Sequence, residues 1–436
     1  MCIFAKQEAI KMKLNGQVTD AVDFYQGHDP HELVREYGSP LYVYNERIFR
    51  KNCKDFVNMC PYPDFSVNYS IKANSNLKLL SIAKSEGLKA EAVSPGEIEA
   101  LLVAGFKSED IFYVTNNASA EEMKYAINKG LIFSADSLSQ LDKYGQLNPG
   151  GRVAVRFNPG VGSGHHIKVI TGGRDTKFGI NESYIPQIKE ILAKHKLTIV
   201  GINQHIGSYI LDINIFMESV ERLLAVAKNF ETLEFIDLGG GFGIPYHKQD
   251  GEQPINLPVL GQALANFMEE FSKSYGRQLR FMVEPGRYIP AESSVLLGTV
   301  NGIKNNGEEK YIGTDVGFSV LVRPVMYDAF HGIEIYREGT EIKYPLEKEV
   351  VRVVGNICET GDYIAKDRYL PVIQEGDVLG ILDAGAYGYS MSSNYNHRLR
   401  PAEILIKESG EISIIRRRDT YKDLLSNMMD GDGVLG

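Results

Sequence analysis

The chain has 436 residues, of which 43% are hydrophobic and 24% charged, and its formal net charge is −9. These proportions are typical of a globular protein, and the length is sufficient for two domains with large cores. The negative charge argues against nucleic acids and anionic membranes as partners. No stretch approaches the roughly 20 apolar residues of a membrane span, and the amino terminus has neither the charge order nor the apolar run of a signal peptide.

The cysteines are sparse and irregularly spaced, with no CxxC pair: Cys2, Cys53, Cys60 and Cys358. This usage favours a reducing compartment over a disulfide framework. We therefore expect a soluble, cytoplasmic protein.

The first 45 residues contain two short elements. Residues 1 to about 20 read as a short leader helix or a frayed end. Residues 29–38 predict a helix, because Asp29 can cap it, Pro30 occupies its first turn and Gly38 can close it. A short β-branched and aromatic run predicts a strand over 41–44.

A regular alternation of strand and helix patterns begins at Ile48. Strands are expected at 66–72, 89–93, 111–115, 131–135, 152–157, 198–205, 233–238 and 280–284. Helical patterns lie between them at 76–86, 95–104, 119–129, 137–145, 183–194, 215–229 and 258–275. Eight strands separated by helices predict a (β/α)8 barrel, of the TIM-barrel type. A doubly wound open sheet stays as the alternative, because a strand count alone does not close a barrel.

After about residue 295 the pattern changes to short β-branched runs separated by turn residues. These runs are 294–300, 311–314, 350–354, 377–382, 403–406 and 412–415. They predict an all-β second domain, to which the strand at 41–44 would be added. The expected domains are therefore a segment 1–44 that contributes a strand to the β domain, a barrel 45–295 and a C-terminal β domain 296–436, with a closing helix and a loose end after Asp419.

Polar side chains follow the predicted barrel strands, at the end where such barrels place their chemistry. Lys72 stands at the carboxyl end of the first strand, where an apolar body below the amine favours loss of its proton and attack on a carbonyl. The other strand ends carry Glu91, Arg156, His205 with Ser208, Asp237 with Gly239–Gly241, and Glu284 with Arg287.

Taken singly, each of these groups also has an ordinary structural reading. Lys72 can be a solvated lysine, His205 a core histidine, and the glycine run Gly239–Gly243 a tight turn. The spacing of this run fits neither a Walker loop nor a GxGxxG fingerprint. Together, however, a lysine that can form a Schiff base, a glycine loop that can bind an anion and a carboxylate for a pyridinium describe a pyridoxal phosphate site.

From about Tyr37 to Ile415 the chain resembles the pyridoxal-phosphate decarboxylases with the alanine-racemase fold (fold type III). The resemblance is carried by seven motifs in order: Tyr69–Asn74, His205–Ser208, Leu238–Gly241, Glu284–Tyr288, Val322–Tyr327, Cys358–Asp362 and Asp383–Gly388. It implies that Lys72 is the Schiff-base lysine, that His205 stacks on the cofactor ring and that Glu284 pairs with the ring nitrogen. It also implies that the remaining cofactor contacts come from Glu91, Ser208, Gly240, Gly241, Pro285, Gly286, Arg287 and Tyr387. No metal site is expected.

The resemblance further implies decarboxylation of meso-2,6-diaminopimelate to L-lysine and CO2, the last step of lysine biosynthesis. Arg287, Arg323, Tyr327 and Tyr387 would contact the substrate, because forked arginine donors suit its distal carboxylate. Glu359 would suit the distal ammonium, and Cys358 would reprotonate the carbanion. In this family the Cys-Glu loop reaches the partner's site, so a homodimer with shared active sites is implied.

Two other functions remain open at this point. The first is a decarboxylase of ornithine, lysine or a D-diamino acid, for which two arginines facing an end without a carboxylate would be unfavourable. The second is a regulatory relative without catalysis, which would lack the lysine or its partners.

The departures from the family pattern are Thr360, Tyr209 and the loop 162–166. None removes a group that the mechanism needs, although Tyr209 and His166 could alter the pocket wall.

Overall fold

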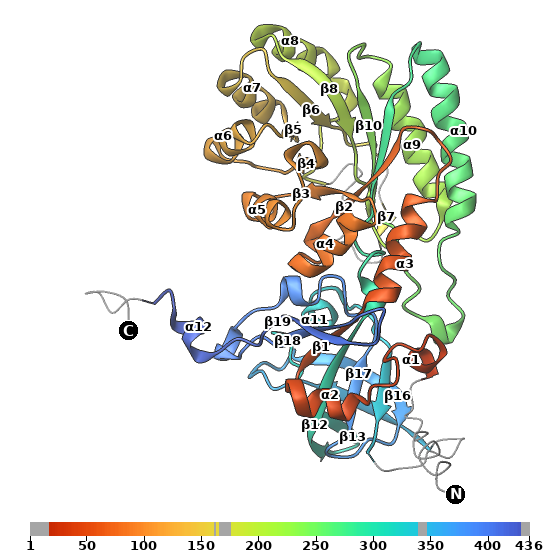
Figure 1. Cartoon of the computed structure of the whole chain (residues 1–436), viewed down its shortest axis with the longest axis vertical. Coiled ribbons are helices and arrows are strands. Elements are labelled where there is room, and N and C mark those ends of the chain that lie inside the picture. Colours follow the sequence, from red (N-terminus) through yellow and green to blue (C-terminus); the bar gives the residue numbers. More distant parts are fainter. Residues whose placement is uncertain (1–16, 161–162, 165–175, 339–346, 429–436) are drawn as a thin grey trace, which may run out of the picture. The chain divides into compact units, whose positions relative to one another are not determined.

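The computed structural model describes residues 17–160, 163–164, 176–338 and 347–428. The chain forms two compact units, Ile48–Ala291 and a unit that combines Met1–Arg47 with Glu292–Gly436. Figure 1 labels their elements, and each unit is described by itself.

The unit Ile48–Ala291 is built on a closed barrel of eight parallel strands. Their order around the barrel is β10-β11-β2-β3-β4-β5-β6-β8, so each strand pairs with its neighbours in the barrel sequence. Their bounds are β2 (Phe65–Ser70), β3 (Lys89–Ala92), β4 (Ile111–Val114), β5 (Ile132–Ala135), β6 (Arg152–Arg156), β8 (Thr198–Asn203), β10 (Phe235–Gly240) and β11 (Arg280–Glu284). All eight expected strands are present. Closure confirms the barrel and rules out the open sheet.

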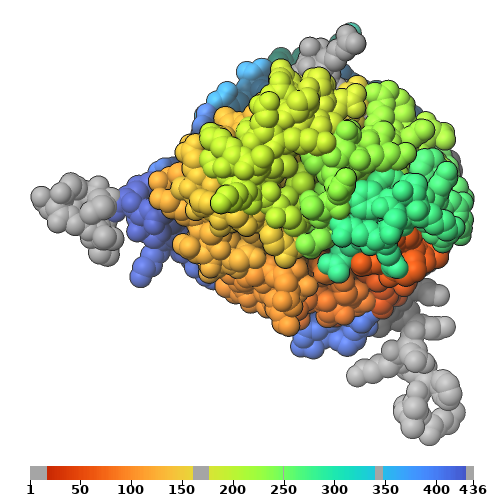
Figure 2. Space-filling view, turned by 90° about the horizontal axis from the view of Figure 1, so that it is seen from above, coloured from red at the N-terminus to blue at the C-terminus, as the bar shows by residue number. Residues whose placement is uncertain are grey.

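Helices follow the strands and surround the barrel. They are α4 (Leu77–Ser85), α5 (Pro95–Val103), α6 (Ala120–Asn128), α7 (Leu138–Leu147), α8 (Ile185–His195), α9 (Ile213–Ala227) and α10 (Leu257–Tyr275). Figure 2 shows these segments following one another around the unit in chain order, from orange to green. The barrel is preceded by a helix that the sequence pattern did not predict, α3 (Glu46–Val57), which begins directly after a strand with no turn residue between them.

The barrel interior is filled by side chains and is not a channel. One buried cluster joins Phe112, Val114, Ala154 and Met282, and the partly buried Ile132 and Phe235 pack against it. Because these residues come from five different strands, the packed interior holds the strand ends at fixed positions relative to one another.

The second unit is a mixed sheet. Seven strands follow the order β16-β15-β13-β12-β1-β18-β19, while β17 pairs with both β12 and β14. The bounds are β1 (Leu41–Asn45), β12 (Ser294–Asn306), β13 (Glu309–Thr314), β14 (Ile333–Tyr336), β15 (Lys348–Val354), β16 (Tyr363–Pro371), β17 (Val378–Ile381), β18 (Ala402–Ile406) and β19 (Ile412–Arg416). Strand β1 pairs antiparallel with β12 and parallel with β18, which confirms that the N-terminal strand joins the β domain. The sequence pattern missed β14 and β16.

Three of the short helices of this unit lie near the chain ends: α1 (Gln17–Ala21), α2 (Pro30–Tyr37) and α12 (Tyr421–Leu425). Helix α2 has the expected ends, since the Asp29 side chain accepts from the amide of His31 and the Gly38 amide donates to Val34 O. The expected leader helix lies mostly outside the described residues, as does the loose C-terminal end. Among the described helices, none is both long and apolar enough to cross a membrane.

Candidate active site

Lys72 lies just beyond the first barrel strand. Strand β2 ends at Ser70, two residues earlier than the sequence pattern predicted, and Lys72 lies in the 3-10 turn that follows, η1 (Ile71–Ala73). Its Nζ donates to both carboxylate oxygens of Glu91, each at 2.9 Å. Glu91 is on the neighbouring strand β3 and only 2% exposed, so its buried carboxylate holds the lysine head group at the barrel end.

A second polar group forms around Arg287, which follows β11 and is 5% exposed. Its Nη2 donates to Ser208 Oγ at 2.8 Å, and its Nη1 donates to Tyr246 Oη at 2.9 Å. Ser208 lies in the short strand β9 (Gly207–Ser208), which pairs with β7 (Ser163–Gly164). A guanidinium next to a hydroxyl, both held by buried neighbours, is a suitable receptor for a phosphate.

The glycine run allows two strands to approach closely. A Cβ on Gly240 would lie 1.8 Å from the backbone oxygen of Glu284, and Gly241 has a φ of +106°. The Gly240 amide donates to His205 Nδ1 at 3.4 Å. Burial holds the pKa of His205 well below its ordinary value, and the charges of Lys72 and Arg156 lower it further. The His205 ring is therefore neutral and flat at the strand end.

Two buried carboxyl groups, Glu284 and Asp237, lie on neighbouring strands of the site. Glu284 ends β11 at 2% exposure, and Asp237 on β10 is fully buried. Burial raises the pKa of Glu284 well above its ordinary value, and the charges of Asp237 and Glu91 raise it further. Burial also raises the pKa of Asp237, to about 6. Glu284 Oε1 has no hydrogen-bond partner among the described residues.

The turn after β11 contains two further predicted residues, Pro285 and Gly286. Pro285 O accepts from the amide of Ser70, which ties the turn to β2, and Gly286 O accepts from the amide of Ile289. The barrel therefore brings the predicted cofactor-binding residues of this unit to one end, around Lys72.

The other predicted residues belong to the β unit and form separate contacts there. Arg323 begins helix α11 (Arg323–Tyr327) and is only 1% exposed, whereas Tyr327, at its end, is half-buried. Cys358 and Glu359 are exposed; the Cys358 amide donates to Asn396 Oδ1 at 3.1 Å, and Tyr395 Oη donates to Glu359 at 2.6 Å.

Tyr387 has a φ of +57°, in a turn after β17 (Val378–Ile381). This left-handed backbone conformation is uncommon for a residue other than glycine. Such positions concentrate at functional sites, where surrounding structure maintains them.

Sequence reasoning did not select several residues that the structure places beside predicted ones. Tyr246 accepts from Arg287, and a histidine, His331, contacts Arg323 at 2.7 Å. Tyr209, noted only as a departure, donates to Glu252 at 2.5 Å, and its ring lies 5.8 Å from that of Tyr246. Asp237 was named from its place at a strand end, two residues before the glycine run, but the partners of the other residues depend on loops that carry no periodic signal.

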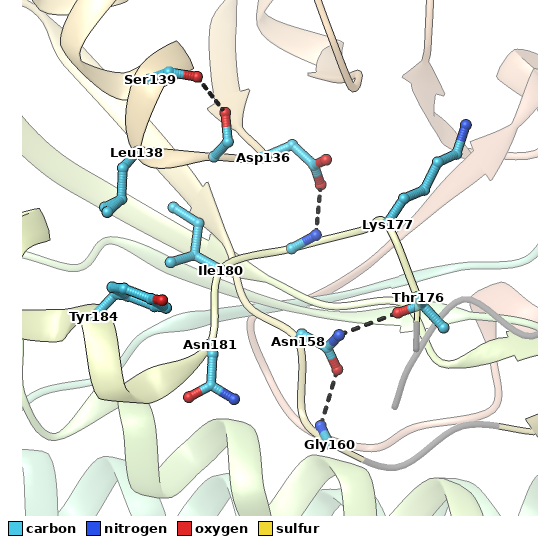
Figure 3. A pocket seen from close by; sticks show the side chains of 12 residues that line it. Asp136, Leu138, Ser139, Asn158, Gly160, Thr176, Lys177, Ile180, Asn181 and Tyr184 are labelled. Atoms are coloured by element: carbon cyan, nitrogen blue, oxygen red, sulfur yellow. Dashed lines mark hydrogen bonds between the residues drawn. The ribbon is translucent and has the colours of Figure 1, made fainter. Parts of the chain in front are cut away.

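A cavity of about 550 Å³ opens in the barrel unit near the ends of β5 and β6. As Figure 3 shows, Asp136 accepts from the amide of Gly179, and Asn158 bridges Thr176 and Gly160. None of the predicted site residues lines this cavity. The unusual loop 162–166 lies largely outside the described residues. Within the described part of the chain, no group of three or more His, Cys, Asp or Glu could hold a metal ion.

Residues 46–291 match the family described as pyridoxal-dependent decarboxylase, pyridoxal binding domain. The chain is 42% identical over 408 residues to a diaminopimelate decarboxylase of Methanothermobacter thermautotrophicus, covering 92% of this chain and 94% of the relative.

Two solved structures align with this chain over at least 90% of its length, which includes both units. A diaminopimelate decarboxylase from Methanocaldococcus jannaschii in complex with L-lysine has a TM-score of 0.82 at 33% identity, covering 94% of this chain and 96% of the other. The diaminopimelate decarboxylase from Helicobacter pylori, also complexed with L-lysine, has a TM-score of 0.81 at 30% identity, covering 90% and 97%.

Proposed function

The chain belongs to the pyridoxal-dependent decarboxylases, and from this membership we propose that it converts meso-2,6-diaminopimelate to L-lysine and CO2 with pyridoxal 5'-phosphate. The observation that carries the proposal is the 42% identity to a diaminopimelate decarboxylase over 92% of the chain, because a match of that length spans the β unit as well as the barrel.

The residues of the barrel end suit pyridoxal phosphate. Lys72 offers an amine for its aldehyde, and Arg287 with Ser208 offers donors for its phosphate. Glu284 offers a buried carboxyl oxygen without a hydrogen-bond partner among the described residues, which fits a ring nitrogen that must carry a proton. When bound, the cofactor supplies an electron sink for the carbon that loses CO2.

Three side chains of the protein have separate roles around the cofactor. With the cofactor bound, the positive charge of a protonated ring nitrogen would favour the ionised form of Glu284, whose carboxylate would then keep the proton on that nitrogen by charge pairing. The neutral ring of His205 would pack against the cofactor without adding a charge. Glu91 holds the free Lys72 amine at the barrel end, where the aldehyde of the cofactor would meet it. Of these three side chains, Glu284 is the one that favours loss of CO2, because it keeps the electron sink protonated.

The β unit supplies the substrate contacts in this proposal. Arg323 binds the distal carboxylate, with Tyr327 and Tyr387 beside it, and Glu359 binds the distal ammonium. Cys358 returns a proton to the carbon that lost CO2. Cys358 and Glu359 are exposed, and we infer that they complete the site of a partner subunit in a homodimer.

We also infer a reducing, cytoplasmic location. The cysteines that the structure describes, Cys53, Cys60 and Cys358, are free thiols, and two of them are buried.

The test is an assay of L-lysine and CO2 formation from meso-diaminopimelate, with ornithine and D-lysine as parallel substrates. We expect turnover of meso-diaminopimelate to exceed that of the other two by orders of magnitude, because they lack the distal carboxylate. Equal or preferred turnover of ornithine or D-lysine would replace the proposal by the alternative decarboxylase.

A further inference from the structure

A histidine outside the predicted site contacts the buried arginine of the β unit. His331 and Arg323 are each 1% exposed, and Arg323 Nη1 lies 2.7 Å from His331 Nε2. On its other side, His331 Nδ1 lies 2.7 Å from the backbone oxygen of Leu382. The imidazole therefore bridges the arginine and the end of strand β17.

These two contacts determine the protonation of the ring. A guanidinium nitrogen can only donate, so His331 Nε2 must be the acceptor and carries no proton. A carbonyl oxygen can only accept, so Nδ1 must carry the proton and donate to Leu382 O. His331 is thus a neutral imidazole in a single tautomer, and each of its nitrogens has a defined partner.

The backbone around His331 keeps the ring in place. The Leu382 amide donates to Gly332 O at 2.9 Å, and Ile333 pairs with Ile381 in the β14–β17 ladder. Arg368 Nη1 donates to the backbone oxygen of His331 at 3.2 Å. Because the ring is tied to the same backbone segment that holds its own residue, it forms a rigid support for the guanidinium.

We propose that His331 is a positioning residue that holds the Arg323 guanidinium in the plane needed to bind the distal carboxylate, and that it thereby selects substrates with a second carboxylate. The inference rests on the proposed function of Arg323. The physical reason is that a guanidinium binds a carboxylate by two parallel bonds only when their planes coincide, and a bond to Nη1 sets that plane.

Two substitutions separate this role from a simple anchoring role. The amide of His331→Gln reaches the place of Nε2, so it can accept from Arg323 but loses the bond to Leu382. The shorter amide of His331→Asn reaches the place of Nδ1, so it keeps the bond to Leu382 but leaves Arg323 without this acceptor. If His331 positions Arg323, Gln is the better replacement; if it only anchors the strand end, Asn is.

Two ligands make the readout specific for the carboxylate. L-Lysine, the expected product, keeps the distal carboxylate, since the reaction removes only one of the two; 1,5-diaminopentane has neither. We expect His331→Asn to weaken L-lysine binding to the holoenzyme by about tenfold or more, as for loss of a hydrogen bond to a charged group. Binding of 1,5-diaminopentane should change less than about twofold, and His331→Gln should stay within about threefold of wild type for both ligands.

Turnover and a double variant complete the test. In His331→Asn the KM for meso-diaminopimelate should rise with little change in kcat, and adding His331→Asn to Arg323→Lys should weaken L-lysine binding no further. The inference is overturned if Asn is tolerated better than Gln, if both ligands weaken equally, or if wild type does not bind L-lysine. Absence of turnover in a wild type that binds L-lysine would instead refute the proposed reaction, because the binding order of the two variants is measured without turnover.

Discussion

Lys72 and Glu91 are neighbours because β2 and β3 pair with Ser70 opposite Glu91. The buried carboxylate of Glu91 therefore binds the lysine head group at the barrel end. This supports Lys72 as the point where the cofactor is attached.

Lys72→Ala should abolish the visible absorbance of the purified protein and lower kcat by several powers of ten, because it removes the covalent amine. Lys78→Ala, which changes an exposed lysine on the next helix, is the matched control and should leave both unchanged. A Lys72→Ala protein that keeps a chromophore reducible by borohydride would contradict the assignment.

Glu97 on α5 is a single residue whose pKa affects the stability of the fold. Its carboxylate accepts from the amide of Val93 at 2.8 Å, and burial raises its pKa to about 7, with the charge of Glu91 adding to the rise. The native carboxyl therefore keeps its proton to a higher pH than the unfolded one. Between the ordinary pKa of about 4.3 and pH 7 the unfolded chain binds fewer protons, so stability falls as the pH rises.

Glu97→Gln removes this titration and keeps an acceptor for Val93. The melting temperature of the variant, relative to wild type, should be higher at pH 8 than at pH 5. Glu99→Gln on the same helix is the control, because Tyr125 and Lys129 lower the pKa of Glu99 and its removal should not stabilise the protein at pH 8. If the melting temperatures of Glu97→Gln and wild type differ by the same amount at both pH values, burial does not raise the pKa of Glu97.

At the scale of elements, the close approach of β10 and β11 shapes the site. Their register shifts between Asp237 and Gly240, which places Gly240 opposite Glu284. The contact is between backbones, so no side-chain rotation can relieve an added methyl group.

Gly240→Ala should therefore separate the two strands and destabilise the protein by about 3 kcal/mol, the upper end of the usual range for overpacking, since a contact with backbone cannot relax locally. The measurement is the melting temperature, together with the fraction of protein that retains cofactor. Gly302→Ala is the control, because a Cβ there meets nothing within 4 Å. Similar melting temperatures for the two variants would mean that β10 and β11 do not approach so closely.

At the scale of the whole molecule, the proposed catalytic groups come from two units. Lys72 belongs to the barrel, whereas Cys358 belongs to the β unit, in a segment that Asp362 ties down by accepting from the amides of Phe318 and Ile357. The exposed Cys358 is thus held in a defined loop from which it could serve a second subunit.

If the sites are shared, two inactive variants should rescue each other. Mixing Lys72→Ala with Cys358→Ala subunits gives about half heterodimers by random pairing, and each heterodimer has one intact site. Activity should return to roughly a quarter of wild type, while each variant alone stays inactive. No rescue, with subunit exchange verified by mass spectrometry, would place Lys72 and Cys358 of one chain in the same site.

The sequence by itself determined most local elements and which polar residues stand at the ends of the barrel strands. Strand and helix periods are local, so the eight barrel strands and the seven helices between them could be predicted from the sequence. The ends of α2 could be predicted as well, from Asp29 and Gly38. Helix α3 could not, because it begins without a turn after β1 and is rich in charged residues, and β16 alternates poorly between buried and exposed positions.

Only the tertiary structure decided which distant groups touch. A strand count is compatible with an open sheet, and closure depends on the pairing of β2 with β11, more than 200 residues later in the chain. The same holds for the partners of the arginines: Ser208 and Tyr246 reach Arg287, and His331 reaches Arg323, through loops without a periodic pattern. Hydrogen bonds act over about 3 Å, so they are fixed by the folded backbone and not by spacing along the chain.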